Sequence, residues 1–262
     1  MAHIELGLDN PNLRTPLINL LLKGTEHWDN IQKRLTGAKS RTPVTIDMMR
    51  VIKRMLIESG YDKHTKVIFW AACTLIWNGS LRVHEALSRS PNDFDPQSTL
   101  LQSDVEIFDE VVDKAKRSVI KINIKSPKED RVGRDVCLEI FGNETFLCPV
   151  RAMNKYLDFR SRYVSEYSDQ PLFIKMNKKC FTGSELNTIL HELTKDVTHN
   201  SNCMVRSHSL RAGVPSELAK QGADPMHIQG VGRWSSDAWQ DYCKLGRKKR
   251  MNITDRLCSS IV

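Results

Sequence analysis

The sequence predicts a mixed α+β fold that is mainly helical and contains a small antiparallel sheet. Apolar residues recur at helical spacing through most of the chain, for example over residues 45–60. Within residues 90–145 the pattern changes, because apolar and polar residues alternate over 120–124 and again over 136–140. Turn-forming residues separate these two runs. Two alternating runs joined by one polar loop predict a hairpin beside the helices.

The first helices are expected between residues 45 and 80. Thr45 is a good N-cap for a helix that ends near Gly60, and Asp47 falls in its first turn. The run from Val67 to Trp77 is apolar on nearly every side, so this helix should form the centre of the core. The tripeptide 78–80, Asn-Gly-Ser, then interrupts the helical pattern.

Helical patterns return after the hairpin. Residues 148–149, Cys-Pro, begin a helix because proline suits the first turn. Thr182 and Glu185 have the spacing of a capping box, in which each residue satisfies a backbone N–H of the other. The helix that carries His208 is expected to end at Gly222, since glycine is the usual residue just after a helix.

Length and charge limit the possible functions. With 262 residues, the chain suits one main domain of about 200 residues, and we assign residues 41–262 to it and residues 1–40 to an appendage. Lys and Arg outnumber Asp and Glu by 39 to 31, which gives a formal net charge of +8. An excess of this size favours a polyanionic partner.

The cysteines and the apolar runs predict an intracellular protein. The seven cysteines are scattered and never form a CxxC pair, which indicates reduced thiols and argues against a zinc framework. The N-terminus lacks the basic and apolar regions of a signal peptide. The apolar run 67–77 is shorter than the roughly 20 residues that a membrane helix needs. No Asp, Glu or His cluster has metal-ligand spacing, so we expect no metal and no cofactor.

The stretch from Met204 to Lys244 carries the strongest chemical signal. His208 and Arg211 are three positions apart, so in a helix an imidazole and a guanidinium share one face. A phosphodiester is well served by such a pair, because arginine donates a fork of hydrogen bonds and histidine moves protons near neutral pH. Trp234 and Tyr242 follow, and a tyrosine can act as a covalent nucleophile.

These residues resemble the C-terminal half of the tyrosine recombinase (phage integrase-like) catalytic domain. The resemblance rests on HSLRAG at 208–213, GRW at 232–234 and a tyrosine eight residues after the tryptophan. The sequence of residues 232–244, GRWSSDAWQDYCK, is most similar to recombinases of eukaryotic DIRS- and Crypton-type mobile elements. The resemblance implies a tyrosine recombinase fold for residues 41–262, and a remnant of an N-terminal helical core-binding domain with its linker for residues 1–40. The alternative for residues 1–40 is a packing helix and a linker.

Residues 81–88, LRVHEALS, resemble the first catalytic block of this family. The resemblance implies that Arg82 completes, with Arg211, a clamp around one phosphate. Glu85 lies three residues later on the same helical face, so it can hold Arg82 through a charge-assisted hydrogen bond. Without the later block, this pair would be an ordinary surface ion pair of small energetic value.

In the family a catalytic lysine lies on a hairpin like the one predicted here. Lys128 is the first choice by its position in SPKED, and Lys125 is the second. Lysines on hairpins more often serve only solubility, which is the alternative for both residues. The basic cluster from Arg247 to Arg250 (Arg247, Lys248, Lys249, Arg250) is either a solvated helix end, a DNA phosphate contact or a nuclear import signal.

The resemblance implies cleavage and rejoining of DNA strands through a 3′-phosphotyrosine on Tyr242, without metal or ATP. Arg82 and Arg211 would stabilise charge on the phosphate, and His208 would exchange a proton with the tyrosine. Lys128 would protonate the departing 5′ oxygen, while Trp234 would donate its indole N–H to the phosphate or pack in the core.

The leading hypothesis is a site-specific recombinase or integrase that acts on double-stranded DNA and self-associates on it as a dimer to tetramer. One alternative is a DNA-binding protein derived from a mobile element that no longer recombines DNA. Others are a type IB topoisomerase-like activity and a helix-rich regulator that only binds partners. The protein is expected in the nucleus if it is eukaryotic and otherwise in the cytoplasm.

Overall fold

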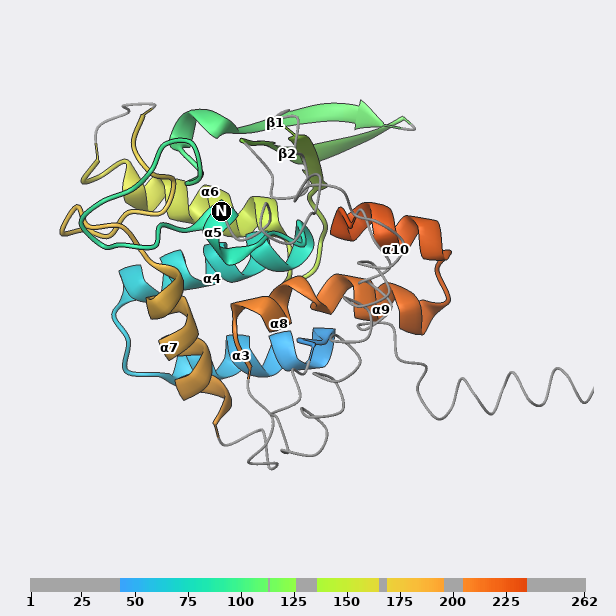
Figure 1. Cartoon of the computed structure of the whole chain (residues 1–262), viewed down its shortest axis with the longest axis horizontal. Helices are drawn as coiled ribbons and strands as arrows, with labels where there is room; N and C mark the ends of the chain where they lie inside the picture. The colour runs from blue at the N-terminus through green and yellow to red at the C-terminus, as the bar shows by residue number, and fades with distance from the viewer. Residues whose placement is uncertain (1–42, 113, 126–135, 165–168, 196–204, 235–262) are drawn as a thin grey trace, which may run out of the picture. The chain divides into compact units, whose positions relative to one another are not determined.

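The computed structural model describes residues 43–112, 114–125, 136–164, 169–195 and 205–234. These residues form the expected mixed, mainly helical fold with a three-stranded antiparallel sheet (Figure 1). The elements in chain order are α3 (Ile46–Glu58), α4 (Lys63–Asn78), α5 (Val83–Ala86), a short 3₁₀ helix η1 (Gln102–Asp104), β1 (Val105–Val112), β2 (Ala115–Ile124), β3 (Val136–Phe141), α6 (Pro149–Arg160), α7 (Gly183–Thr194), α8 (Ser207–Arg211), α9 (Gly213–Gln221) and α10 (Pro225–Gly232).

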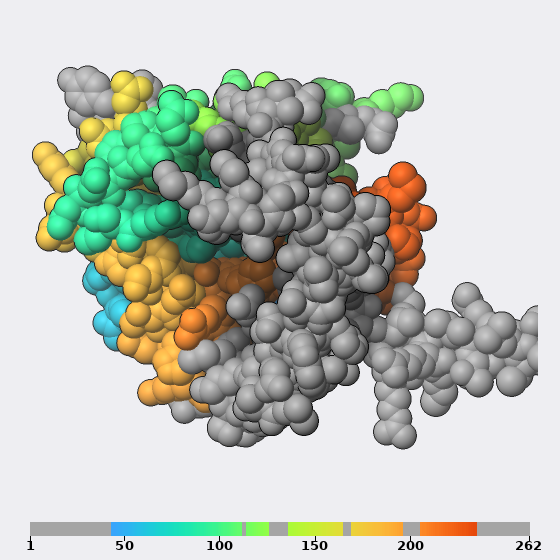
Figure 2. Space-filling model, in the orientation of Figure 1, coloured from blue at the N-terminus to red at the C-terminus, as the bar shows by residue number. Residues whose placement is uncertain are grey.

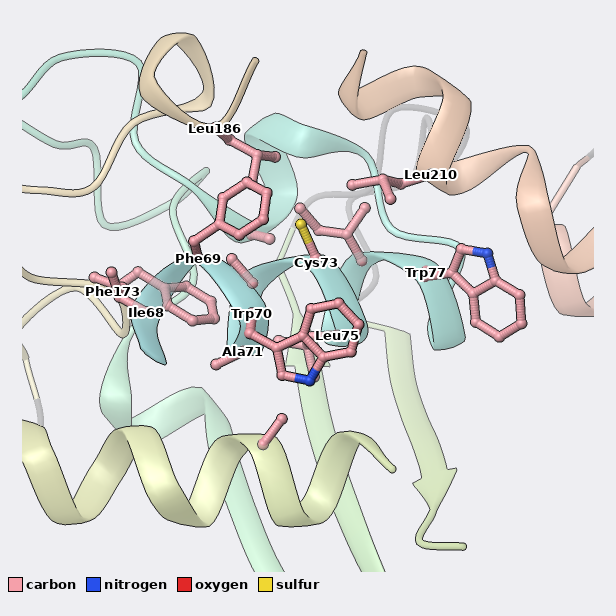
Figure 3. Packing of buried hydrophobic residues seen from close by; sticks show 14 of the residues in the cluster. Ile68, Phe69, Trp70, Ala71, Cys73, Leu75, Trp77, Phe173, Leu186 and Leu210 are labelled. Carbon is pink, nitrogen blue, oxygen red and sulfur yellow. The ribbon is translucent and has the colours of Figure 1, made fainter. Parts of the chain in front are cut away.

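The core is built around α4, as its apolar sequence predicts. Every residue of α4 from Val67 to Trp77 is buried. Figure 3 shows side chains leaving this helix in several directions, with Phe69 toward Leu186 and Trp77 toward the other end of the cluster. The Trp77 indole donates a 2.8 Å hydrogen bond to the carbonyl of Val44, which fastens the segment before α3 to the end of α4.

The other elements pack on α4 in layers. α6 contacts α4 and also the strands β2 and β3 (Figure 1). The end of α4 at Gly79 lies against Leu138 and Ile140 of β3, so the sheet packs on both helices. α3, α8 and α9 also contact α4, and α7 contacts α3 and α8. Leu210 of α8 is fully buried in the same cluster, and this packing carries the helix of the predicted site to the end of α4.

The predicted hairpin is present, and a third strand extends it. β2 pairs with both neighbours in the order β1-β2-β3, with Ile122 opposite Val105 on one side and Leu138 on the other. Ile120, Ile122 and Ile124 are buried, whereas Lys121 between them is exposed. The alternation that predicted the strand is therefore the alternation between the core face and the solvent face.

The segment 207–221 is two helices, so the expectation of one helix from His208 to Gly222 was wrong. α8 ends at Arg211, and α9 begins at Gly213. Pro215 accounts for the break, because it has no N–H to donate to the carbonyl of Arg211. Gly222 does close α9, with a left-handed φ of 86° that glycine adopts without a steric penalty.

The chain after α5 lies beside the chain that enters α7. In Figure 2 the teal surface of the first segment borders the yellow and gold surface of the second. Two backbone bridges join these segments, one between Ser88 and Thr182 and one between Leu101 and Pro171. Thr182 forms the predicted capping box with Glu185 at the start of α7. These contacts tie α5, the helix that follows Arg82, to the rest of the fold.

The regions outside the described residues include the predicted appendage, residues 1–40, and the basic cluster from Arg247 to Arg250. Within the part of the chain that the structure describes, no helix is long and apolar enough to cross a membrane.

Candidate functional site

The candidate site begins where α4 ends. Gly79 caps α4, and Ser80 takes a left-handed backbone conformation with φ 45°, which turns the chain sharply. Leu81 is buried and anchors the turn. Arg82 is the N-cap of α5, so it lies directly between this turn and the helix. The sequence Asn-Gly-Ser that predicted a break thus sets the position of Arg82.

Glu85 holds Arg82 through both of its carboxylate oxygens. Oε1 accepts a 2.8 Å hydrogen bond from Nη1 of Arg82, and Oε2 accepts one of 2.8 Å from the backbone N–H of Arg82. Oε2 also accepts a 2.7 Å hydrogen bond from Nη2 of Arg233. The side chains of Arg82, Glu85 and Arg233 are only 13%, 7% and 14% exposed. The ion pair expected from the spacing of Arg82 and Glu85 is present, and a second arginine shares it.

The carboxyl of Glu85 is stabilised in its charged form. Burial by itself raises the pKa of this group, but the charge of Arg233 and the hydrogen bonds from Arg233 and Arg82 outweigh burial. The pKa of Glu85 is therefore lowered from its ordinary value. A buried carboxylate that stays ionised between two guanidinium groups keeps both of them in fixed positions.

Arg211 joins the turn after α4 to the end of α10. Its Nη1 donates a hydrogen bond to the carbonyl of Ser80, and its Nη2 donates one of 2.7 Å to the carbonyl of Gly232. The residue is 3% exposed. Its guanidinium carbon lies 5.4 Å from the centroid of the Trp234 ring, a distance typical of a cation–π contact. Arg211 therefore connects the two segments that carry Arg82 and Trp234.

The end of α10 places Arg233 and Trp234. Asp224 caps the start of this helix by accepting a hydrogen bond from the N–H of Met226. Arg233 is its C-cap, with the left-handed values φ 52° and ψ 47°. The backbone N–H of Trp234 then donates to the carbonyl of Gln229, whose side-chain amide donates to the carbonyl of Trp234. Gln229 therefore holds both the backbone N–H and the backbone carbonyl of Trp234.

Lys125 and Glu85 line one small pocket together with Asp104 and neighbouring residues. The ammonium of Lys125 lies 2.9 Å from Oδ2 of Asp104, whose side chain is only 7% exposed. It also donates to the carbonyl of Pro96 at 3.3 Å. The end of β2, from which the predicted lysine hairpin continues, therefore lies beside the carboxylate that holds Arg82.

The structure brings together four of the predicted site residues, namely Arg82, Glu85, Arg211 and Trp234. His208 is half-buried on α8, less than one turn before Arg211. The positions of Lys128, of Tyr242 and of the basic cluster Arg247, Lys248, Lys249 and Arg250 lie outside the described residues. The catalytic roles of all these residues stay predictions.

Arg233 is the residue that sequence reasoning missed. It stands in the GRW run that supported the resemblance, but only Trp234 of this run was given a role. A charged residue at the point where a helix ends, next to two motif residues, was the available signal. Among the described residues, Arg82, Arg211, Arg233 and Glu85 contribute three guanidinium groups and one carboxylate, a net charge of +2 in a largely buried cluster. Such a cluster attracts an anion.

No protein-family model matches the sequence, and no curated protein sequence matches it. Solved structures do match the fold. The XerH site-specific recombinase bound to difH substrate, in a pre-cleavage complex, has a TM-score of 0.56 and 13% identity over 81% of this chain and 53% of that chain. XerH bound to palindromic difH substrate, in a post-cleavage complex, has a TM-score of 0.58 and 12% identity over 81% and 51%.

A lambda integrase dimer bound to a COC′ core site matches less well, with a TM-score of 0.49 and 13% identity over 78% of this chain and 48% of that chain. This chain spans about half the length of the XerH chains that it matches. Identities this low show the fold alone. The described part of the chain is therefore a mixed, mainly helical fold with a three-stranded antiparallel sheet that resembles the tyrosine recombinase catalytic domain.

Proposed function

We propose that this chain is a site-specific DNA recombinase or integrase that cleaves and rejoins DNA strands through a 3′-phosphotyrosine on Tyr242. The observation that carries the proposal is that Arg211 is hydrogen-bonded to the turn that precedes Arg82. Arg211 bonds the carbonyl of Ser80, two residues before Arg82, and the carbonyl of Gly232, beside Trp234. Fixed guanidinium groups of this kind stabilise the charge that develops on a phosphate during displacement, because their positive charges and N–H donors are already in place.

The remaining roles follow from the chemistry of each group. His208 exchanges a proton with the tyrosine, and Trp234 supports the phosphate or the packing around it. Lys128 protonates the departing 5′ oxygen. We choose Lys128 and not Lys125 because the ammonium of Lys125 is held by the buried carboxylate of Asp104. An ammonium held in this way is poorly placed to deliver a proton to DNA.

Double-stranded DNA is the proposed partner, and the chain is proposed to self-associate on it. The formal net charge of +8 supports a polyanionic partner, and the XerH structures with similar fold contain a DNA substrate. We also propose, from the sequence of residues 232–244, that the chain comes from a eukaryotic mobile element of the DIRS or Crypton type. A protein of this origin would act in the nucleus. The basic residues 247–250 would then contact DNA or direct nuclear import.

A covalent-adduct assay on randomised DNA tests the proposal for many target sequences at once. The full chain is incubated in EDTA with a pool of nicked duplexes that are randomised around the nick, and adducts are captured on a denaturing gel and sequenced. The expected result is an adduct formed by the parent and absent from Tyr242→Phe. Adducts that survive this substitution would assign the nucleophile to another residue.

The same assay separates the alternatives. A parent that retards duplex DNA but forms no adduct at any sequence is a DNA-binding protein without recombination activity, and the proposed function is then wrong. Relaxation of a supercoiled plasmid with adducts but without recombinant products would instead identify a type IB topoisomerase-like activity.

A further inference from the structure

We propose that Arg233 is a positioning residue for strand cleavage, which acts through Glu85 on Arg82. This inference rests on the proposed function, because Arg82 is its predicted phosphate ligand. Arg82 and Arg233 come from α5 and α10, which are 148 residues apart at the Glu85–Arg233 contact. One carboxylate therefore aligns two segments that must act on the same phosphate.

The contact geometry makes Glu85 the link between the two arginines. Its Oε2 accepts from the backbone N–H of Arg82 at 2.8 Å and from Nη2 of Arg233 at 2.7 Å. Within the described residues, Nε and Nη1 of Arg233 are buried and have no hydrogen-bond partner. The polar interaction of this guanidinium is thus concentrated on Glu85. Charged hydrogen bonds in such partly buried surroundings are strong and directional.

The backbone at Arg233 supports a role for its side chain. A left-handed C-cap with φ 52° and ψ 47° is the usual place for glycine or asparagine. Any other residue there costs about 1 kcal/mol, and positions that keep such strain are frequently functional. Glycine would satisfy the backbone equally well. What arginine adds at this position is its bond to Glu85.

The charges around Glu85 predict how Arg233 affects pH dependence. Arg82 faces the carboxylate from its own helix and Arg233 faces it from α10, while Lys125 and Asp104 line the adjoining pocket. Burial raises the pKa of Glu85, and Arg233 is the largest of the influences that lower it. Loss of Arg233 raises this pKa, so Glu85 becomes protonated, and releases Arg82, at a higher pH than in the parent.

The test measures single-turnover adduct formation at saturating DNA for four proteins. They are the parent chain, Arg233→Gly, Arg82→Ala and the double variant that combines both substitutions. Arg233→Gly removes the guanidinium and keeps a favourable backbone. We expect it to form adducts about 100-fold more slowly, the effect of a small misplacement of a catalytic group. Its rate should also begin to fall at a higher pH as the solution is acidified. Lys220→Ala, which removes the cation of an exposed ion pair on α9, is the control and should match the parent.

Non-additivity distinguishes positioning from a separate role. If Arg233 acts through Arg82, the double variant is no slower than Arg82→Ala alone. Glu85→Gln, which keeps the shape of the side chain, should reproduce the defect and serves if Arg233→Gly folds poorly. Parental rates and a parental pH profile in Arg233→Gly, or fully additive slowing in the double variant, would overturn the inference. Absence of adducts from the parent itself would instead overturn the proposed function.

Discussion

The guanidinium carbon of Arg211 lies 5.4 Å from the centroid of the Trp234 ring. This contact depends on Gly232, whose carbonyl accepts from Nη2 of Arg211 and whose Cα faces the indole. A Cβ at Gly232 would lie 1.7 Å from Cζ3 of Trp234, far inside van der Waals contact. The glycine of the GRW run is therefore required by the tryptophan two residues later.

We predict that Gly232→Ala displaces the Trp234 indole and weakens the bond from Arg211. The free energy of unfolding should fall by about 1–3 kcal/mol, the usual cost of forcing an extra methyl into a packed site. Urea denaturation of the full chain measures this change. Adduct formation, if the proposed function holds, should decrease in the same variant because Arg211 loses an anchor.

Gly230→Ala in the same helix is the matched control. A Cβ at Gly230 meets nothing within 4 Å, and alanine is favoured over glycine inside a helix by about 1 kcal/mol. This variant should be as stable as the parent or more stable. Equal stability of Gly232→Ala and Gly230→Ala would show that the Trp234 indole does not pack against Gly232.

Local signals in the sequence predicted most of the helices and the pairing of Arg82 with Glu85. The caps Thr45 and Thr182 act on backbone groups three residues away, and the pairing of Arg82 with Glu85 also spans three residues. Such short-range interactions depend only on the helix that contains them. The alternation that gave β2 is equally local, which is why the fold class was confirmed.

One part that was missed depends on a distant neighbour, whereas two others have local causes. The bond of Arg233 to Glu85 spans 148 residues, and nothing in GRW states which carboxylate the arginine meets. β1 was not assigned as a separate strand, because Phe108 and Asp109 interrupt the alternation that Val105, Glu106 and Ile107 begin. The break between α8 and α9 was available from Pro215, whose missing N–H is a local signal.

Arg211 should be required for stability as well as for the proposed chemistry. We predict that Arg211→Lys lowers the free energy of unfolding by about 1–3 kcal/mol, because an ammonium lacks the planar fork that reaches the carbonyls of both Ser80 and Gly232. Arg206→Lys changes an exposed arginine at the N-cap of the same helix and should leave stability unchanged. Chemical denaturation of both variants checks this, and equal midpoints would contradict a structural role for the fork.

The last prediction concerns His64, which is 5% exposed and shares a hydrogen bond with the hydroxyl of Tyr163. Burial lowers the pKa of His64 below its ordinary value of 6.5, although the charge of Asp62 opposes this shift. Burial also raises the pKa of Tyr163 to about 12, so this hydroxyl stays neutral in the same range. The folded protein therefore prefers neutral His64, whereas the unfolded chain takes up a proton near pH 6.5.

The contribution of neutral His64 to the free energy of unfolding is complete above that pH, and it is lost as the pH falls toward the lower pKa of the folded state. Urea denaturation at several pH values should show a steeper acid loss for the parent than for His64→Gln, with exposed His191→Gln matching the parent. Parallel curves for the parent and His64→Gln would mean that His64 binds its proton equally well in the folded and unfolded states.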